Sequence, residues 1–153
     1  MLSFDQLEAW APDHVCAHHT PRDPAVQAAY DLHIKEVQEQ YTSLKAYLLS
    51  KVFKRPVFVD SSNPGKRCAL NFLKSATPVW VLRPNEFPYD VEPGVEHHVA
   101  WRSSPDPPPP GELEALLAAR WPPAEFQLAW WVNEPTIRTV PEFHHAQVFV
   151  RRC

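Results

Sequence analysis

The sequence predicts an α+β fold in which N-terminal helices are followed by an antiparallel sheet that one further helix interrupts. Apolar residues recur at spacings of three and four between residues 24 and 53, the pattern of a helix with one buried face. From residue 56 onward, short runs rich in valine and aromatic residues alternate with turn-forming residues, which is typical of strands. Residues 112–121 are helical in pattern again and are stopped by Pro122 and Pro123. Helices followed by strands in this order are typical of α+β proteins.

The N-terminal helices are predicted from their caps as well as from their apolar spacing. Residues 3–10 are expected to form a short helix, because Ser3 can cap it. Asp23 can cap the long helix, with Pro24 in the first position, where a missing N–H has no cost. A helix of about 30 residues would be roughly 45 Å long, so we expect a bend or a break near residues 42–43.

The predicted strands alternate with turns and with one stiff connector. Residues 61–65 are a turn cluster, and residues 103–110 include four consecutive prolines, which favour an extended connector. All 153 residues are expected to form a single domain, with a helical part at 1–55 and a sheet part at 56–153 that carries the candidate site. The strands are predicted at residues 56–60, 67–74, 78–83, 96–102, 126–133 and 146–151.

Composition and charge argue against several classes of function. The chain has 15 Lys and Arg against 18 Asp and Glu, a net charge of -3, whereas nucleic-acid binding requires a basic face. No apolar run approaches the ~18 residues of a membrane span, and the N-terminus lacks the features of a signal peptide. Three widely spaced cysteines are typical of free thiols in a reducing compartment. We therefore expect a cytoplasmic protein with no nucleic-acid partner and no membrane partner.

The strongest candidate site lies at the start of the last predicted strand. Because side chains alternate along a strand, His145 and Gln147 share one face with Phe143, and His144 faces the other side. A neutral His145 can attack a phosphorus atom while Gln147 donates a hydrogen bond to a phosphate oxygen. The alternative is that both histidines are partly exposed residues at a strand end and have no role.

Two polar residues nearby extend this candidate site. Asn133 ends an apolar strand, where a polar side chain is costly unless it is used or satisfied. Arg138 lies beside the strand-end histidines in the sequence and can pair with a phosphate. We therefore include both among the predicted ligand-binding residues.

A proline-rich loop at residues 83–98 is the second candidate region. Three prolines and several aromatic residues, Tyr89 among them, pre-order this loop, so less entropy is lost when a ligand binds. Asn85 can hydrogen-bond the edge of a base or a sugar, and His97 or His98 can reach a phosphate. The alternative is that these prolines simply make turns in a chain that has few glycines.

The cluster of His14, Cys16, His18 and His19 contains residue types that bind metals. A zinc site usually needs two pairs of ligands at suitable separation, and the chain has no partner pair for this cluster. We therefore predict a loop and no metal site. No tightly bound cofactor is implied, and magnesium is left open as an accessory ion.

Residues 85–101, 130–135 and 139–150 together resemble a poorly characterised family whose fungal members are called N-acetylglucosamine-induced proteins. The segments Phe-Pro-Tyr-Asp-Val and Val-Glu-His are the most specific parts of this resemblance. The family name records when such proteins are expressed, so it implies no reaction.

The same segments resemble, more distantly, the histidine triad superfamily, which implies a histidine-triad-like core around a nucleotide phosphate. In this resemblance His145 takes the place of the nucleophile, and Gln147 takes the final place, as in the sugar-phosphate uridylyltransferase branch. Asn133 matches the family's asparagine, and residues 96–97 match its first strand. Phe143 stands where the first histidine is expected, which is a departure from the pattern.

These observations leave three hypotheses. The first is a histidine-triad-like hydrolase or transferase that acts on a nucleotide or sugar phosphate. The second, which the missing first histidine favours, is a non-catalytic binding module for a nucleotide sugar or another phosphorylated metabolite. The third is an interaction protein that uses residues 105–110 as a polyproline ligand. Under the first two, the partner is a phosphorylated small molecule, the catalytic candidates are His145, Gln147 and His97, and the ligand-binding candidates are Asn85, Tyr89, His98, Asn133, Arg138 and His144.

Overall fold

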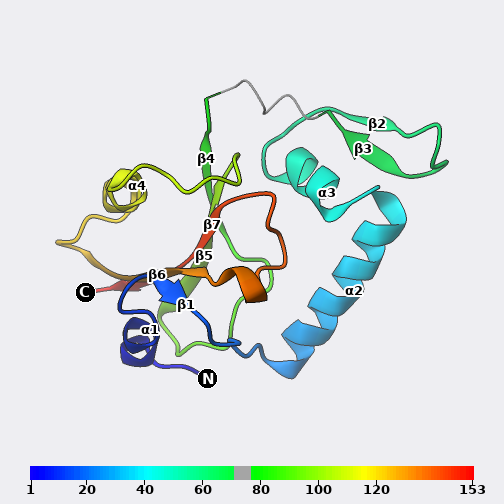
Figure 1. The fold of residues 1–153 in the computed structure, drawn as a ribbon. Coiled ribbons are helices and arrows are strands. Elements are labelled where there is room, and N and C mark those ends of the chain that lie inside the picture. Colours follow the sequence, from blue (N-terminus) through cyan, green and yellow to red (C-terminus); the bar gives the residue numbers. More distant parts are fainter. Residues whose placement is uncertain (71–76) are drawn as a thin grey trace.

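The computed structural model describes residues 1–70 and 77–153, and it confirms the α+β class (Figure 1). The helices are α1 (Phe4–Trp10), α2 (Pro24–Gln40), α3 (Leu44–Lys51) and α4 (Glu112–Arg120), and a short 3-10 turn covers Pro135–Ile137. The strands are β1 (Val15–Cys16), β2 (Val57–Val59), β3 (Arg67–Ala69), β4 (Trp80–Pro84), β5 (Val95–Arg102), β6 (Phe126–Asn133) and β7 (His145–Arg152).

The main sheet has the strand order β1-β6-β7-β5-β4. Neighbouring strands are antiparallel, except that β1 runs parallel to β6. At the centre of the sheet, His145 lies opposite Trp101 and Gln147 lies opposite Val99. Their side chains therefore share one face, and His144 is on the other face, as the alternation along the strand predicted.

Two parts of the sequence prediction were wrong about which strands join the main sheet. Strands β2 and β3 pair with each other in a separate two-stranded ribbon. Residues 71–74 of the predicted strand 67–74 lie outside the described residues. Conversely, a strand that was not predicted, β1, is part of the main sheet. Two residues are too few to give an alternating pattern, and a local pattern does not identify the strand with which a segment pairs.

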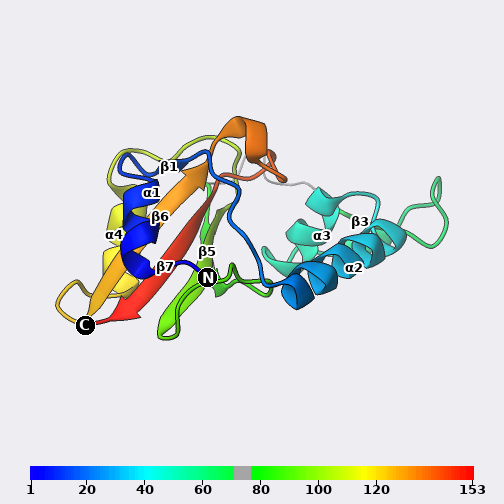
Figure 2. The same ribbon diagram turned by 90° about the horizontal axis from the view of Figure 1, so that it is seen from below.

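The N-terminal helices α1 and α2 begin at the residues that their caps predicted. Ser3 accepts a hydrogen bond from the Gln6 amide, and Asp23 accepts one from the Ala25 amide. The predicted break in the long helix is confirmed, because α2 ends at Gln40 and Ser43 then caps α3. Within α2 only Val37 is buried, and both ribbon views show this helix at the periphery of the molecule (Figures 1 and 2).

The two faces of the sheet are covered differently. On one face, here called the α4 face, side chains of α4 pack against β5 and β7 in one apolar cluster that includes Leu113, Leu117, Ala146 and Val148. The opposite face, here called the cavity face, is covered at one end by α1, where Phe4 and Leu7 pack against Trp131 and Phe149. Figure 2 shows α2 and α3 on the side of the molecule away from α4.

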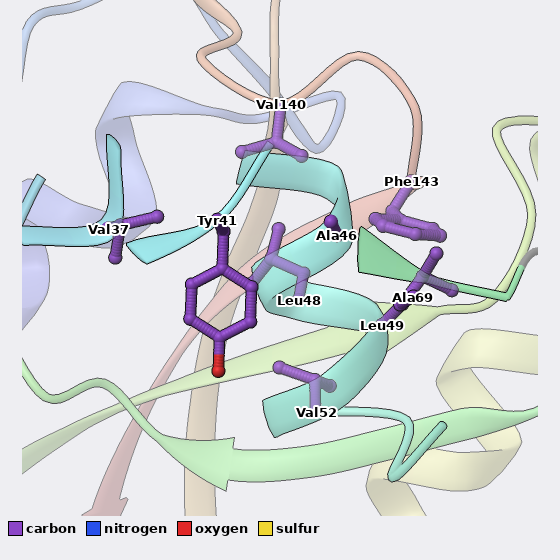
Figure 3. Packing of buried hydrophobic residues seen from close by; sticks show 9 residues of the cluster. All are labelled: Val37, Tyr41, Ala46, Leu48, Leu49, Val52, Ala69, Val140 and Phe143. Atoms are coloured by element: carbon purple, nitrogen blue, oxygen red, sulfur yellow. The ribbon is translucent and has the colours of Figure 1, made fainter. Parts of the chain in front are cut away.

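The other end of the cavity face is covered by α3. Residues of α3, together with Phe143 and Val140, form a second buried cluster on this face (Figure 3). Trp101 of β5 packs against the edge of this cluster. The cavity face therefore carries two separate apolar clusters, and the space between them positions the candidate site.

Among residues 1–70 and 77–153, no helix combines the length and the apolar character that crossing a bilayer requires.

Candidate active site

A cavity of about 270 Å³ lies between the cavity face of the sheet and the helices α2 and α3. Its floor is formed by β5 and β7, and its roof by α2, α3 and the loop that follows β4. The segment before α2 and the segment after β6 complete its walls. The sequence-predicted residues that line it are His145, Gln147, Asn85, Tyr89 and Asn133.

The cavity lies where polar side chains interrupt the apolar pattern of the sheet. The floor carries His145 and Gln147 between the apolar cluster under α1 and the cluster under α3. Burying these groups against apolar side chains without hydrogen bonds would be costly. The apolar side chains therefore pack into two separate clusters, and the polar side chains line the cavity between them.

His145 is held so that one ring nitrogen remains an acceptor. Its Nδ1 lies 2.9 Å from the Phe143 carbonyl oxygen. Because a carbonyl only accepts, Nδ1 donates this hydrogen bond, and in the neutral ring Nε2 keeps the lone pair. Burial lowers the pKa of His145, and the positive charge of Arg138 acts in the same direction. The ring also stacks on Trp101, with centroids 4.7 Å apart, so the His145 side chain is oriented as well as neutral at neutral pH.

Gln147 is oriented by a chain of hydrogen bonds that runs beneath the cavity. The Tyr89 backbone N–H donates to Nδ1 of His97 at 3.0 Å. The neutral ring therefore carries its proton on Nε2, which lies 2.8 Å from Oε1 of Gln147 and donates to it. Burial lowers the pKa of His97 to about 3, so the ring stays neutral. The Gln147 oxygen is thus occupied, and its NH2 group is the part free to donate to a ligand.

His97 itself does not line the cavity. It contacts the cavity floor through the hydrogen bond that its Nε2 donates to Gln147. Its ring stacks on Phe149 with centroids 4.4 Å apart and packs at a tilt against Tyr89 at 4.5 Å.

Asn85, Tyr89 and Asn133 line the wall beside Gln147. The Asn85 side-chain oxygen accepts the Phe87 amide at 2.9 Å, which fixes the turn after β4. Burial raises the pKa of the Tyr89 hydroxyl, and the positive charge of Arg22 and the Asn133 side chain act in the opposite direction. The Asn85 side chain is therefore ordered before any ligand binds.

The structure does not bring the remaining predicted site residues to the cavity wall. His144 lies on the α4 face, edge-on to Trp80 at 6.2 Å, and burial lowers its pKa to about 4. His98 is on the same face, where its Nε2 is 2.8 Å from the Glu96 carboxylate. Arg138 donates from Nε to the Asn133 carbonyl at 2.7 Å and thereby holds the end of β6.

Sequence reasoning missed a cation in the cavity wall, Arg22. Its Nε donates to the Phe87 carbonyl at 2.9 Å. Its guanidinium lies 4.4 Å from the ring centroid of Tyr30 and 5.1 Å from that of Tyr89. Arg22 lies just before the cap of α2, and nothing in its sequence context distinguishes it from a surface arginine. The aromatic residues of the roof were also missed, because they face the cavity from elements far apart in the chain.

The described residues include no group of three or more His, Cys, Asp and Glu side chains that could hold a metal ion. In the N-terminal cluster, His14 stacks on Trp130 with centroids 3.8 Å apart, and Cys16 is buried. His18 and His19 line the cavity wall.

The fold and this site define an α+β protein in which a helical unit roofs a polar region of the sheet. The chain belongs to the family described as Protein of unknown function (DUF3605), whose model matches residues 16–109. That stretch contains the roof, the loop after β4 and strand β5, whereas His145 and Gln147 lie beyond it.

A yeast protein and a solved structure are similar to this chain. Uncharacterized protein YPL067C of Saccharomyces cerevisiae is 30% identical over 90 residues, which cover 50% of this chain and 46% of that protein. The match thus spans less than half of the relative's length. The crystal structure of HTC1 has a similar fold, with a TM-score of 0.58 over 99% of this chain and 85% of that chain, at 21% identity. At this identity the likeness concerns the fold alone.

Proposed function

We propose that this protein binds a phosphorylated small molecule in the cavity and hydrolyses or transfers its nucleotidyl or sugar-phosphate group through His145. The observation that carries this proposal is the hydrogen bond from Nδ1 of His145 to the Phe143 carbonyl, which leaves the Nε2 lone pair as the reactive group. Gln147 supplies an oriented N–H donor, and Arg22 supplies a positive charge in the cavity wall. A developing phosphate charge needs donors of this kind, held in place before the reaction.

In the first step, Nε2 of His145 attacks phosphorus and forms a P–N bond. The bond from phosphorus to the leaving-group oxygen breaks, and that oxygen keeps the electron pair. The Nδ1–H of His145 remains hydrogen-bonded to the Phe143 carbonyl oxygen, and this bond stabilises the positively charged ring. In the second step, water or an acceptor hydroxyl attacks phosphorus, the P–N electron pair returns to Nε2, and the attacking oxygen loses its proton to solvent.

The nature of Gln147 favours one class of leaving group. An amide donates a hydrogen bond but does not transfer a proton, so it cannot act as the general acid for an alkoxide. A phosphate group leaves as a stable anion and needs no such acid. The proposed substrates are therefore diphosphates such as nucleotide sugars, in preference to simple phosphate esters.

The sequence resemblances support this proposal. Asn133, His145 and Gln147 match the histidine triad superfamily, so we propose a histidine-triad-like core with a degenerate triad. We also propose kinship with the fungal N-acetylglucosamine-induced proteins, on the segments 85–101 and 139–150. Membership in that family implies no particular reaction.

A non-catalytic binding module is the second candidate. Phe143, which replaces the first histidine of the triad, is buried in the cluster under α3 and packs against Phe53 with ring centroids 5.0 Å apart. It therefore contributes no group to the chemistry, and the same cavity would bind the phosphorylated ligand without converting it.

A trapping experiment tests the catalytic proposal. The protein is incubated with nucleotide sugars and nucleoside diphosphates, with and without magnesium, and the peptide that contains His145 is analysed by mass spectrometry at alkaline pH. We expect a covalent phosphoryl or nucleotidyl adduct on His145, and no adduct in His145→Gln. Ligand binding without any adduct or turnover would support the binding module. An absence of both binding and turnover would overturn both proposals.

A further inference from the structure

We infer that the outer edge of β2 is a docking site for an extended, acidic segment of a partner protein, which adds a third strand to the β2–β3 ribbon. This surface is separate from the cavity, because the side chains that line the cavity include none from residues 53–70. Both ribbon views show the β2–β3 ribbon at the end of the molecule away from α4 (Figures 1 and 2). The inference is therefore independent of the proposed function.

The backbone groups of β2 point alternately toward β3 and away from it. Asp60 donates its backbone N–H to the Lys66 carbonyl at 3.0 Å, directly after the last paired residue of β2. Antiparallel strands exchange hydrogen bonds at every second residue, so Phe58 also faces β3. The N–H and C=O groups of Val57 and Val59 therefore point to the outer edge, where β2 has no neighbouring strand among the described residues.

This edge carries apolar side chains and lacks the usual protection against pairing. Val57, Phe58 and Val59 are 41%, 46% and 65% exposed. Protected edge strands carry a charged residue, a proline or a bulge, and β2 has none of these within its three residues. Of the eight large apolar residues that are exposed in the described chain, four lie in residues 57–70. A strand of this kind is a template for the addition of another strand.

The charge around β2 selects an acidic partner. Residues 51–70 contain five Lys and Arg and one Asp, a net charge of +4, in a chain whose net charge is -3. Lys54 and Arg55 directly precede the strand, and Lys66 and Arg67 lie beside its far end. None of the five cations forms an ion pair with another described residue. A strand with carboxylates at both ends and an apolar middle complements this surface.

Two other occupants fit the edge less well. A second copy of this chain offers the same backbone groups, but it would bring two surfaces of charge +4 together. An anionic membrane attracts cations, but lipids have no strand to pair with the outer edge. The turn at 61–65 also has no large apolar and no cationic side chain that would enter a bilayer. Only the acidic strand satisfies both the backbone groups and the charge.

Fluorescence anisotropy with synthetic peptides tests the docking site. The probe is the labelled peptide Glu-Glu-Val-Thr-Val-Thr-Val-Glu-Glu. One control peptide has Lys in place of every Glu, and a second has Pro in place of the central Thr-Val-Thr, which keeps the charge and removes the strand's N–H donors. We expect the probe to bind at least about tenfold more tightly than either control, because each control removes one of the two kinds of interaction.

Variants of the protein locate the binding at β2. Val59→Pro removes an N–H that points away from β3, so it should weaken binding of the probe about 5- to 10-fold while the ribbon keeps its own hydrogen bonds. Lys54→Glu should weaken binding about 2- to 5-fold. The matched control is Lys35→Glu, which makes the same change of charge at an exposed position of α2 and should leave the affinity unchanged. Melting temperatures confirm that the variants are folded.

Amide exchange measured by NMR gives a readout that does not depend on affinity. The bound probe should slow exchange at Val57 and Val59 and change it little at Phe58, whose N–H already faces β3. No binding of the probe at low salt, equal binding of the three peptides, or unchanged exchange at Val57 and Val59 would overturn the inference. Sedimentation as a dimer that Val59→Pro dissociates, or binding to phosphatidylserine vesicles but not to the probe, would overturn it in favour of a second copy or a membrane.

Discussion

The two faces of the sheet treat adjacent histidines in opposite ways. His144 and His145 follow each other at the start of β7, and both are buried with a lowered pKa. On the α4 face, His144 is packed against Trp80 under an apolar helix. On the cavity face, His145 is stacked and hydrogen-bonded along one edge and borders the cavity along the other. Burial alone therefore does not distinguish a histidine packed in a closed apolar cluster from one that borders a cavity; the element that covers each histidine does.

The apolar packing is continuous on the α4 face and interrupted on the cavity face. The α4 face carries one apolar cluster in which Leu117 is 1% exposed. The cavity face carries two clusters, under α1 and under α3, with the hydrogen-bonded chain from Tyr89 through His97 to Gln147 between them. The same sheet thus supports dry packing on one side and a preorganised polar site on the other.

The largest expected effect separates the two histidines by turnover. With a nucleotide-sugar substrate, His145→Gln should lower kcat by at least about 10³-fold, because the proposed nucleophile is removed. The control, His144→Gln, changes the neighbouring residue on the other face and should keep kcat within about twofold. Initial rates measure both. Equal losses of kcat in the two variants would show that His145 has no catalytic role that His144 lacks.

Packing gives the next largest effect. Leu117→Ala on α4 should lower the free energy of unfolding by about 2–5 kcal/mol, because it leaves a void in a closed cluster. Ile34→Ala in the roof should cost less than about 1.5 kcal/mol, because this half-buried side chain already borders open space. Urea denaturation measures both values. A cost for Ile34→Ala that matched the cost for Leu117→Ala would mean that the cavity is closed in solution.

The pair His97 and His98 repeats the comparison at β5. His97→Leu should cost about 1–3 kcal/mol, because it leaves the Tyr89 N–H and the Gln147 oxygen without their partner. His98→Leu should cost at most about 1 kcal/mol, because its carboxylate partner, Glu96, is 71% exposed. Denaturation gives the stabilities, and titration with pyrophosphate should show weaker binding for His97→Leu alone. The reverse order of stabilities would refute the assigned hydrogen-bond chain.

The smallest effect is a pH dependence to which both faces contribute. Burial lowers the pKa of His97 from 6.5 to about 3 and that of His144 from 6.5 to about 4. Between these values and 6.5 the unfolded chain binds protons that the folded chain does not, so stability is full above pH 6.5 and falls as the pH is lowered. From pH 7 to pH 5.5 we expect a loss of about 1 kcal/mol for each histidine.

Denaturation at these two pH values tests the dependence on each face. His97→Gln and His144→Gln should each have a smaller loss than the unmodified protein, and by similar amounts. Identical losses in all three proteins would assign the effect to other groups.

The sequence was sufficient where a structural decision was local. The cap at Ser43, the prolines after α4 and the alternation along β7 each depend on neighbouring residues, so the helix break, the end of α4 and the shared face of His145 and Gln147 were predictable. Strand partners are decided by residues far apart in the chain, and this is why the separate β2–β3 ribbon and the short β1 were missed.

The floor of the candidate site was predictable from the sequence, and its roof was not. The floor comes from polar residues at strand positions, which alternation identifies. The roof is different, because Arg22, His33, Tyr47 and Phe87 converge only once α2 and α3 have folded over the sheet. In the sequence, His33 and Tyr47 belong to an ordinary amphipathic pattern, and such a pattern predicts burial in general but does not predict which residues border a space.

The anchoring of α2 has a consequence for local unfolding. With Val37 as its one buried residue, this helix has little apolar contact of its own, and elements of that kind open at low free-energy cost while the rest of the protein stays folded. A ligand between α2 and the sheet would close that opening and raise its free energy with the logarithm of ligand concentration. A slowing of amide hydrogen exchange confined to residues 24–40 would then measure directly the fraction of the protein that has a ligand in the cavity.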